Sequence, residues 1–186
     1  MAFVDSSSNM EELNLRVFLV CTHSPAGALP LGIMVTSDEK RETLEEGFKH
    51  LKNCMGDKAF FSALYPKIFM TDNCDELRDA LHEVWPLATL LLCTFHILQQ
   101  VWRWLHEKEH GVNLDDRPQL LQLVKRILYA RTDDEFNDRV NEMRENELIG
   151  VYSKVKGVLF VLDNLNLEYL HIFLFISNSI FHLVVA

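Results

Sequence analysis

Glycine is scarce in this sequence, and no glycine-rich phosphate-binding motif is present. The 186 residues include 7 glycines, and none of them forms a phosphate loop. The G-x-S-x-G motif of serine hydrolases is missing as well. The sequence therefore gives no support for a P-loop or for Ser-His-Asp catalysis, and Ser6 to Ser8 are interpreted as loop residues.

Positive charge is also in deficit. Lys and Arg number 18 against 27 Asp and Glu, which gives a formal net charge of −9. A protein that binds nucleic acid by bulk electrostatics needs clustered basic residues, so the composition argues against that mode. An acidic composition does suit a site in which carboxylates bind divalent cations.

The four cysteines lie far apart and form no C-x-x-C pair. Cys21 and Cys93 fall in strand-like segments, while Cys54 and Cys74 fall on helical faces. Buried free thiols in a reducing compartment are therefore expected in preference to disulfides.

The start of the sequence shows neither a basic region nor a long apolar core, so no signal peptide is expected. We therefore expect the nucleus, with the cytoplasm as the alternative. Residues 170–186 form an apolar tail without Asp, Glu, Lys or Arg, near the lower limit of about 17 residues for a transmembrane helix. Two histidines and a Ser-Asn-Ser break favour a buried apolar segment over a membrane anchor.

Three segments near the start have the apolar, β-branched and aromatic residues typical of strands. They comprise residues 2–5, 15–21 and 29–36, and a Ser-Pro-Ala-Gly turn at 24–27 separates the second from the third. Short connections of this kind predict an antiparallel meander.

Helical periodicity fills most of the remaining sequence. Ser37 and Thr132 are expected to cap two helices, and Glu135 completes a capping box with Thr132. The apolar stripes are Leu44, Phe48, Leu51 and Met55; Phe95, Leu98, Trp102 and Leu105; and Leu120, Val124, Ile127 and Leu128. The pair Trp102 and Trp104 fits core or partial surface packing better than stacking on a nucleic-acid base.

The stretch 67–81 organises the chain. An apolar run, 68–70, stops at Asp72, and a helical pattern follows at once. This predicts a buried strand that delivers a carboxylate to the sheet edge where α/β proteins bind ligands. Asn73 is expected to cap the helix in a capping box with Glu76, and the alternative is that Asp72 merely helps to cap it.

Residues 87–93 form a continuous apolar run, as expected for a strand covered on both faces. The sequence therefore predicts an α/β fold with a mixed sheet, in which parallel strands follow a three-strand antiparallel meander, and then an all-helical region. In such a sheet Asp5 and Asp72 end up adjacent at one edge. Two converging carboxylates suit a two-metal phosphoryl-transfer site with Mg²⁺ or Mn²⁺.

Cys93 and His96 form a C-x-x-H element at a strand-to-helix junction. This is half of a zinc-type spacing, and no second half lies nearby, so no structural zinc site is expected within the chain. A buried thiol beside a hydrogen-bonded histidine, near the carboxylate edge, is the favoured interpretation.

Together these motifs resemble a Mutator-like element (MULE) transposase domain. The resemblance is carried by Phe-Val-Asp5, Leu-Pro-Leu-Gly32 with Thr-Ser-Asp-Glu39, Phe-Met-Thr-Asp72 and Cys93-Thr-Phe-His96, in this order. It extends over about residues 2–160. Its most specific part is Thr-Asp followed by C-x-x-H about twenty residues later.

The resemblance implies an RNase H-like fold and a DDE-type reaction, in which metal-activated water or a DNA 3′-hydroxyl attacks a phosphodiester. Asp5 would be the first acid and metal ligand, Asp72 the second, and Glu168 is the candidate for the third. The implied partners are DNA and, as an open alternative to the monomer, a second copy of the chain. The expected divisions are 1–112 for the RNase H-like core, 113–164 for a helical insertion, and 165–186 for the tail.

The sequence also departs from the family pattern. No tryptophan follows Trp104, although the family's third acid usually follows a Trp-containing segment, and Glu168 matches that motif poorly. The N-terminal zinc-type DNA-binding module and the C-terminal SWIM-type module are absent. We therefore expect a truncated transposase, and a catalytically inactive, transposase-derived interaction module is the alternative function.

Overall fold

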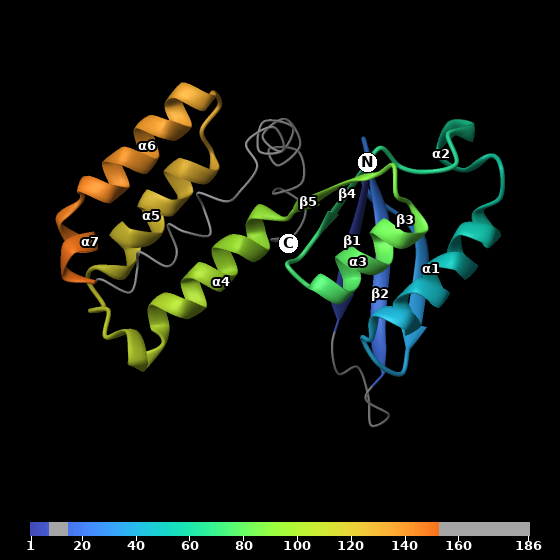
Figure 1. Ribbon diagram of the computed structural model, residues 1–186, viewed down its shortest axis with the longest axis horizontal. Helices are drawn as coiled ribbons and strands as arrows, with labels where there is room; N and C mark the ends of the chain where they lie inside the picture. The colour runs from blue at the N-terminus through green and yellow to red at the C-terminus, as the bar shows by residue number, and fades with distance from the viewer. Residues whose placement is uncertain (8–14, 153–186) are drawn as a thin grey trace. The chain divides into compact units, whose positions relative to one another are not determined.

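The computed structural model describes residues 1–7 and 15–152, which belong to two compact units, Met1–Cys93 and Thr94–Ala186. The first unit is a mixed α/β structure and the second is helical over its described part (Figure 1). The apolar tail, the expected helical insertion after residue 152 and Glu168 lie outside the described residues. The expected domain boundaries after residues 112 and 164 therefore stay predictions.

A five-stranded mixed sheet forms the centre of the first unit (Figure 1). Its strands are β1 (Ala2–Ser7), β2 (Arg16–Ser24), β3 (Gly27–Thr36), β4 (Ile68–Thr71) and β5 (Thr89–Leu92), in the order β3-β2-β1-β4-β5. Strands β1, β2 and β3 pair antiparallel, whereas β4 pairs parallel with both β1 and β5. The predicted meander and the predicted parallel strands are confirmed.

A tight turn joins β2 to β3 and explains why both strands extend beyond their predicted ends. The Ser24 hydroxyl donates to the Gly27 carbonyl at 2.9 Å and accepts from the Ala26 amide at 3.2 Å. Gly27 has a φ of 115°, a backbone conformation that residues other than glycine disfavour. The ladder therefore continues to Ser24 and restarts at Gly27.

Two helices, α1 (Arg41–Met55) and α3 (Asp75–Val84), cover one face of this sheet, while the short α2 (Ala59–Ser62) lies in the connection before β4 (Figure 1). The Trp85 ring packs against Phe69 of β4 at 5.1 Å and against Phe48 of α1 at 5.9 Å between ring centroids. The core side chains below 2% exposure include Leu44, Phe48, Phe69, Leu77 and Leu81. Burial of this apolar surface is the main stabilising term for the unit.

The predicted Ser37 cap of α1 is wrong. The helix begins at Arg41, with Lys40 in the cap position and no side-chain capping bond. Thr36 and Asp38 instead make local bonds. The Thr36 hydroxyl donates to the Asp38 carbonyl at 2.6 Å, and the Asp38 carboxylate accepts from the Lys40 amide at 3.1 Å. These turn-forming bonds delay the helix start, because short polar side chains compete for the backbone.

The prediction that the strand within residues 87–93 is covered on both faces is confirmed in part, since no residue of β5 is exposed but most are only half-buried. Only Leu91 of β5 is buried, and Thr89, Leu90 and Leu92 are half-buried. Since β5 is the edge strand of the sheet, its second neighbour is missing from the ladder. A continuous apolar run therefore did not distinguish an edge strand from a central one.

The second unit contains α4 (Thr94–His106), a short 3₁₀ helix η1 (Lys108–His110), α5 (Arg117–Leu128), α6 (Asp133–Glu145) and α7 (Glu147–Val151). Helix α5 packs between α4 and α6 (Figure 1). The predicted stripe of α5 is confirmed, since Leu120, Val124, Ile127 and Leu128 are all buried. No helix among residues 1–7 and 15–152 is long and apolar enough to cross a membrane.

The predicted stripe of α4 is wrong at two positions. Phe95 and Trp102 are 45% and 44% exposed, whereas Leu98, Val101 and Leu105 are buried. Leu98 and Leu105 belong to both possible stripes, so the sequence alone did not decide between Val101 and Trp102. The Trp102 ring contacts the His106 ring at 4.0 Å, in the partial surface packing that was expected.

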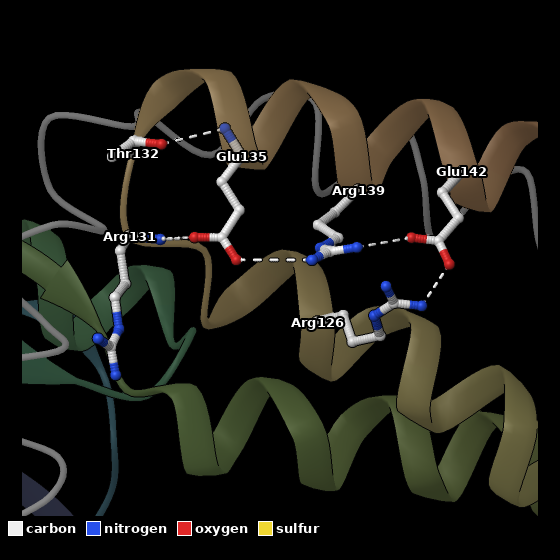
Figure 2. Close-up of polar contacts among 6 residues, drawn as sticks. All are labelled: Arg126, Arg131, Thr132, Glu135, Arg139 and Glu142. Carbon is white, nitrogen blue, oxygen red and sulfur yellow. Dashed lines mark hydrogen bonds and ion pairs between the residues drawn. The ribbon is translucent and has the colours of Figure 1, made fainter.

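Helix α6 begins with the predicted Thr132 cap, while the Glu135 carboxylate bonds one residue earlier than a capping box requires (Figure 2). The Thr132 hydroxyl accepts from the Glu135 amide at 3.1 Å, and the Glu135 carboxylate reaches back to the Arg131 amide at 2.9 Å. Further along, Glu142 accepts from Arg139 at 3.1 Å and pairs with Arg126 of α5. Hydrogen bonding from Arg139 is the main cause that lowers the pKa of Glu142, with Arg126 adding to it.

Replacing Thr132 by Ala should destabilise α6 by about 1 kcal/mol, because the Glu135 amide loses its acceptor. Native-state hydrogen exchange of the first-turn amides would measure the effect. Thr132→Ser keeps the hydroxyl and serves as the matched control. Equal protection in the Ala and Ser variants would contradict the capping role.

Glu142→Gln should destabilise the protein at pH 7 and cease to do so in acid. A carboxyl whose folded pKa is lowered stabilises the fold above its unfolded pKa of about 4.3, and this contribution disappears as the pH falls through the lowered folded value. Denaturant unfolding between pH 7 and pH 3 would measure it. Gln122→Ala, an exposed change on α5, is the control, and a Glu142→Gln effect that does not vary with pH would contradict the assignment.

Candidate metal site at the β1–β4 edge

The register of the parallel pair β1–β4 gives Asp5 and Asp72 matching positions. The paired residues are Ala2↔Phe69 and Phe3↔Met70, each 67 residues apart (69 − 2 and 70 − 3). Asp5 and Asp72 are separated by the same 72 − 5 = 67 residues. The predicted neighbourhood of the two acid-bearing strands is therefore confirmed, and both acids stand two positions beyond the last recorded pair.

Asp5 lies inside β1 rather than at its end. The strand continues to Ser7, and Asp5 pairs with Leu19 of β2. On its other side, β4 ends at Thr71 after only four residues, so the recorded pairing with β1 stops before Asp5. Ala2 and Val4 point into the helix-covered core, and the alternation of a strand places Asp5 on the opposite face, where it is exposed.

Asp72 joins β4 to α3. Its carboxylate accepts from the Cys74 amide at 3.3 Å, and α3 begins at Asp75 with Cys74 in the cap position. The predicted capping box of Asn73 and Glu76 is therefore wrong, because Cys74 stands in the cap position and no side chain caps the helix. A carboxylate offers two oxygens with two lone pairs each, so this bond leaves Asp72 able to bind a cation.

Arg78, one turn into α3, reaches back to the Asp72 junction, and sequence reasoning did not single it out. Its guanidinium donates to the Thr71 hydroxyl at 3.3 Å and to the Leu90 carbonyl of β5 at 3.5 Å. Burial lowers the pKa of Arg78, while Asp75 and Asp72 favour its charged form. The available signal was a basic residue six positions after Asp72 in an acid-rich helix start.

Cys21 of β2 is a close neighbour of Asp5 in the sheet. Phe3 pairs with Cys21 and Asp5 pairs with Leu19, so Asp5 and Cys21 are diagonal neighbours across the ladder. Burial is the main cause that raises the pKa of the Cys21 thiol, and the negative charge of Asp5 raises it further.

All four cysteines are free, as predicted. Their predicted burial holds for Cys21 and is wrong for Cys54, which is exposed, while Cys74 and Cys93 are half-buried. Burial is also the main cause that raises the pKa of Cys74.

The C-x-x-H element lies where the first unit ends and the second begins. The Cys93 amide donates to the Thr71 carbonyl at 2.7 Å, which extends the β4–β5 ladder to the residue before Asp72. His96 lies in the first turn of α4, with its ring edge-on to Phe95 at 5.5 Å. Among residues 1–7 and 15–152, no three His, Cys, Asp or Glu side chains gather so that they could hold a metal ion.

The family model of the MULE transposase domain matches residues 3–100, which is more than half of the chain and contains Asp5, Asp72 and the C-x-x-H element. This chain belongs to the MULE transposase domain family. The predicted family is confirmed.

A similarity to a much longer protein accompanies this match. The MULE domain chain is 29% identical over 99 residues to a PKS-NRPS hybrid synthetase, cheA, of Chaetomium globosum. The matched stretch covers 53% of this chain and 2% of that protein. Because the matched stretch is so small a part of the synthetase, the similarity carries no argument about the chemistry of this chain.

The two acids of this MULE domain fit a hard divalent cation. Mg²⁺ and Mn²⁺ prefer oxygen ligands, and Mg²⁺ commonly retains several waters while one or two carboxylates hold it. Asp5 and Asp72 supply two such groups at matching register positions. The site does not fit a structural zinc ion in the same way, because tetrahedral zinc sites use four Cys or His ligands.

Asp5→Asn should lower the pKa of the Cys21 thiol, since the nearby negative charge disappears. The pH dependence of Cys21 alkylation, followed by peptide mass spectrometry, should then shift to lower pH, with faster labelling at a fixed pH of 8. Asp79→Asn, an equal charge change on α3, is the control. An unchanged Cys21 profile in Asp5→Asn would contradict the proximity of the two groups.

Proposed function

We propose that this MULE domain cleaves and transfers DNA strands, with a divalent cation held by Asp5 and Asp72. The observation that carries the proposal is the common 67-residue offset between the paired residues of β1 and β4 and between the two acids, of which Asp5 lies on β1 and Asp72 directly follows β4. Membership of a transposase family supports this reaction class. The substrate that follows is DNA, and the compartment that follows is the nucleus.

The sheet order supports an RNase H-like fold for the first unit. A three-strand antiparallel meander is followed by two parallel strands on the side of β1, and the acids lie on the two central strands of this arrangement or directly after them. In open sheets, ligands bind beyond the carboxyl ends of parallel strands. Asp72 follows β4 at such an end.

The chain contributes orientation and charge to the reaction. Asp72 is fixed at the start of α3 by its bond from the Cys74 amide, and Asp5 is held in register by its pairing with β2. Asp5 and Asp72 would hold divalent cations, one of which would activate the attacking oxygen of a phosphodiester displacement while the other would stabilise the leaving oxygen. The third acid of a DDE site is proposed to be Glu168, which lies outside the described residues.

Two observations favour a second candidate function, a transposase-derived interaction module without catalysis. In the part of the chain that the structure describes, two acids come to matching positions and no third metal-ligating side chain joins them. A net charge of −9 also opposes bulk electrostatic binding of DNA. The two candidates differ in whether a complete metal site forms.

Calorimetry with Mn²⁺ and nicking of supercoiled plasmid test the proposal. The wild-type chain should bind Mn²⁺ and nick plasmid, and Asp72→Asn or Asp5→Asn should each abolish nicking and weaken binding at least about tenfold, because a site with one carboxylate lacks half of its charged ligands. Asp57→Asn, an exposed acid after α1, is the charge-matched control.

The outcomes separate the two candidates. Absence of both nicking and Asp72-dependent Mn²⁺ binding would favour the interaction module. Nicking that persists unchanged in Asp72→Asn would overturn the assignment of the site.

A further inference from the structure

Arg78 is a half-buried cation that the proposed chemistry does not use. It lies on α3 among Asp72, Asp75 and Asp79, each of which interacts electrostatically with its guanidinium. A guanidinium keeps its proton in proteins, so this positive charge is permanent. It stands beside one of the two acids proposed to bind a cation.

A relay of hydrogen bonds connects Arg78 to the main chain of Asp72. The guanidinium donates to the Thr71 hydroxyl at 3.3 Å, and that hydroxyl donates to the Asp72 carbonyl at 2.8 Å. Thr71 is 1% exposed, so the relay is shielded from water. A second bond, to the Leu90 carbonyl at 3.5 Å, ties the same guanidinium to β5.

We propose that Arg78 is a positioning residue for Asp72, bonded to its main chain through Thr71, and the resident positive charge of this acidic junction. Through Thr71 it fixes the backbone that presents the carboxylate, and through its charge it stabilises the acidic junction before any cation binds. The same charge repels an incoming cation and therefore sets the affinity of the site lower than the acids alone would give. This inference rests on the proposed function, because it concerns the same acid.

The charge of Arg78 is isolated by comparing two variants in Mn²⁺ calorimetry. Arg78→Lys and Arg78→Gln both lose the planar two-bond geometry, but only the Gln variant loses the charge. The Kd for Mn²⁺ should be about three- to tenfold lower in Arg78→Gln than in Arg78→Lys, the effect of one unit charge several ångströms from a divalent ion. This difference in Kd should become smaller as salt is raised from roughly 50 to 500 mM, because salt screens the charges.

A stability measurement adds a readout that a purely structural role would not move. Without metal, Arg78→Gln should unfold at a lower temperature than Arg78→Lys. Saturating Mn²⁺ should then raise the Tm of Arg78→Gln by more than that of Arg78→Lys, because the cation replaces the missing charge. Arg41→Gln, which removes an arginine paired with Asp79 and Glu83, is the control and should leave the Kd unchanged.

Thr71→Val tests the positioning part by itself, since it removes the relay and keeps the charge. Mn²⁺ binding should weaken about threefold, the effect expected when one orienting hydrogen bond is lost. This variant also keeps the proposal testable if Arg78→Gln does not fold. An unchanged Kd in Thr71→Val would overturn the positioning role.

The failures of the two proposals are distinguishable. Mn²⁺ binding that survives Asp72→Asn would overturn the proposed function, and the Arg78 inference with it. Binding that depends on Asp72 but has equal Kd in Arg78→Gln and Arg78→Lys would overturn the role of the Arg78 charge alone.

Discussion

The parallel pairing of β1 with β4 is the constraint on which the rest of the first unit depends. Two residue pairs fix the register between segments that lie 67 positions apart in sequence. The same pairing places Phe69 in the core against Trp85 and leaves Asp5 on the face opposite the helices. Apolar packing on one face thus determines where the acids lie at the edge, because the side chains of a strand alternate between its faces.

Thr71 connects this core to the candidate site. Its carbonyl accepts from the Cys93 amide, and its hydroxyl accepts from Arg78 and donates to the carbonyl of Asp72. A fully buried polar side chain is tolerated only when it is hydrogen-bonded, and here all of its bonds lie at one junction. The position of the Asp72 backbone therefore depends on three elements, β4, β5 and α3.

Periodicity in the sequence predicted the elements well and their ends less well. The α5 stripe from Leu120 to Leu128 and the Thr132 cap follow from local spacing, and both are confirmed. The α1 start was missed because Thr36 and Asp38 bond locally in a way that the Ser37 pattern does not reveal. In α4, two stripes share Leu98 and Leu105, and only packing against α5 selects Val101 over Trp102.

The sequence predicted those parts of the candidate site that lie at the ends of apolar strand segments. Asp5 and Asp72 were found because each follows an apolar segment, and their matching positions followed once the strands were ordered. Arg78 was missed because it bonds from α3 to the strand before the helix, β4, and to the strand after it, β5. No local spacing in the sequence encodes such contacts. The proposed third acid, Glu168, lies beyond the described residues.

The brevity of the β1–β4 pairing limits how related sequences can change in length. Insertions or deletions between Gly56 and Lys67 would alter the separation of the two acids in sequence and leave their register intact. One residue gained or lost between Phe3 and Asp5 would instead turn the acid toward the helix-covered face, since each step along a strand reverses the side. The same holds between Met70 and Asp72. Changes in length are therefore tolerated in the connection between α1 and β4, but not between Phe3 and Asp5 or between Met70 and Asp72.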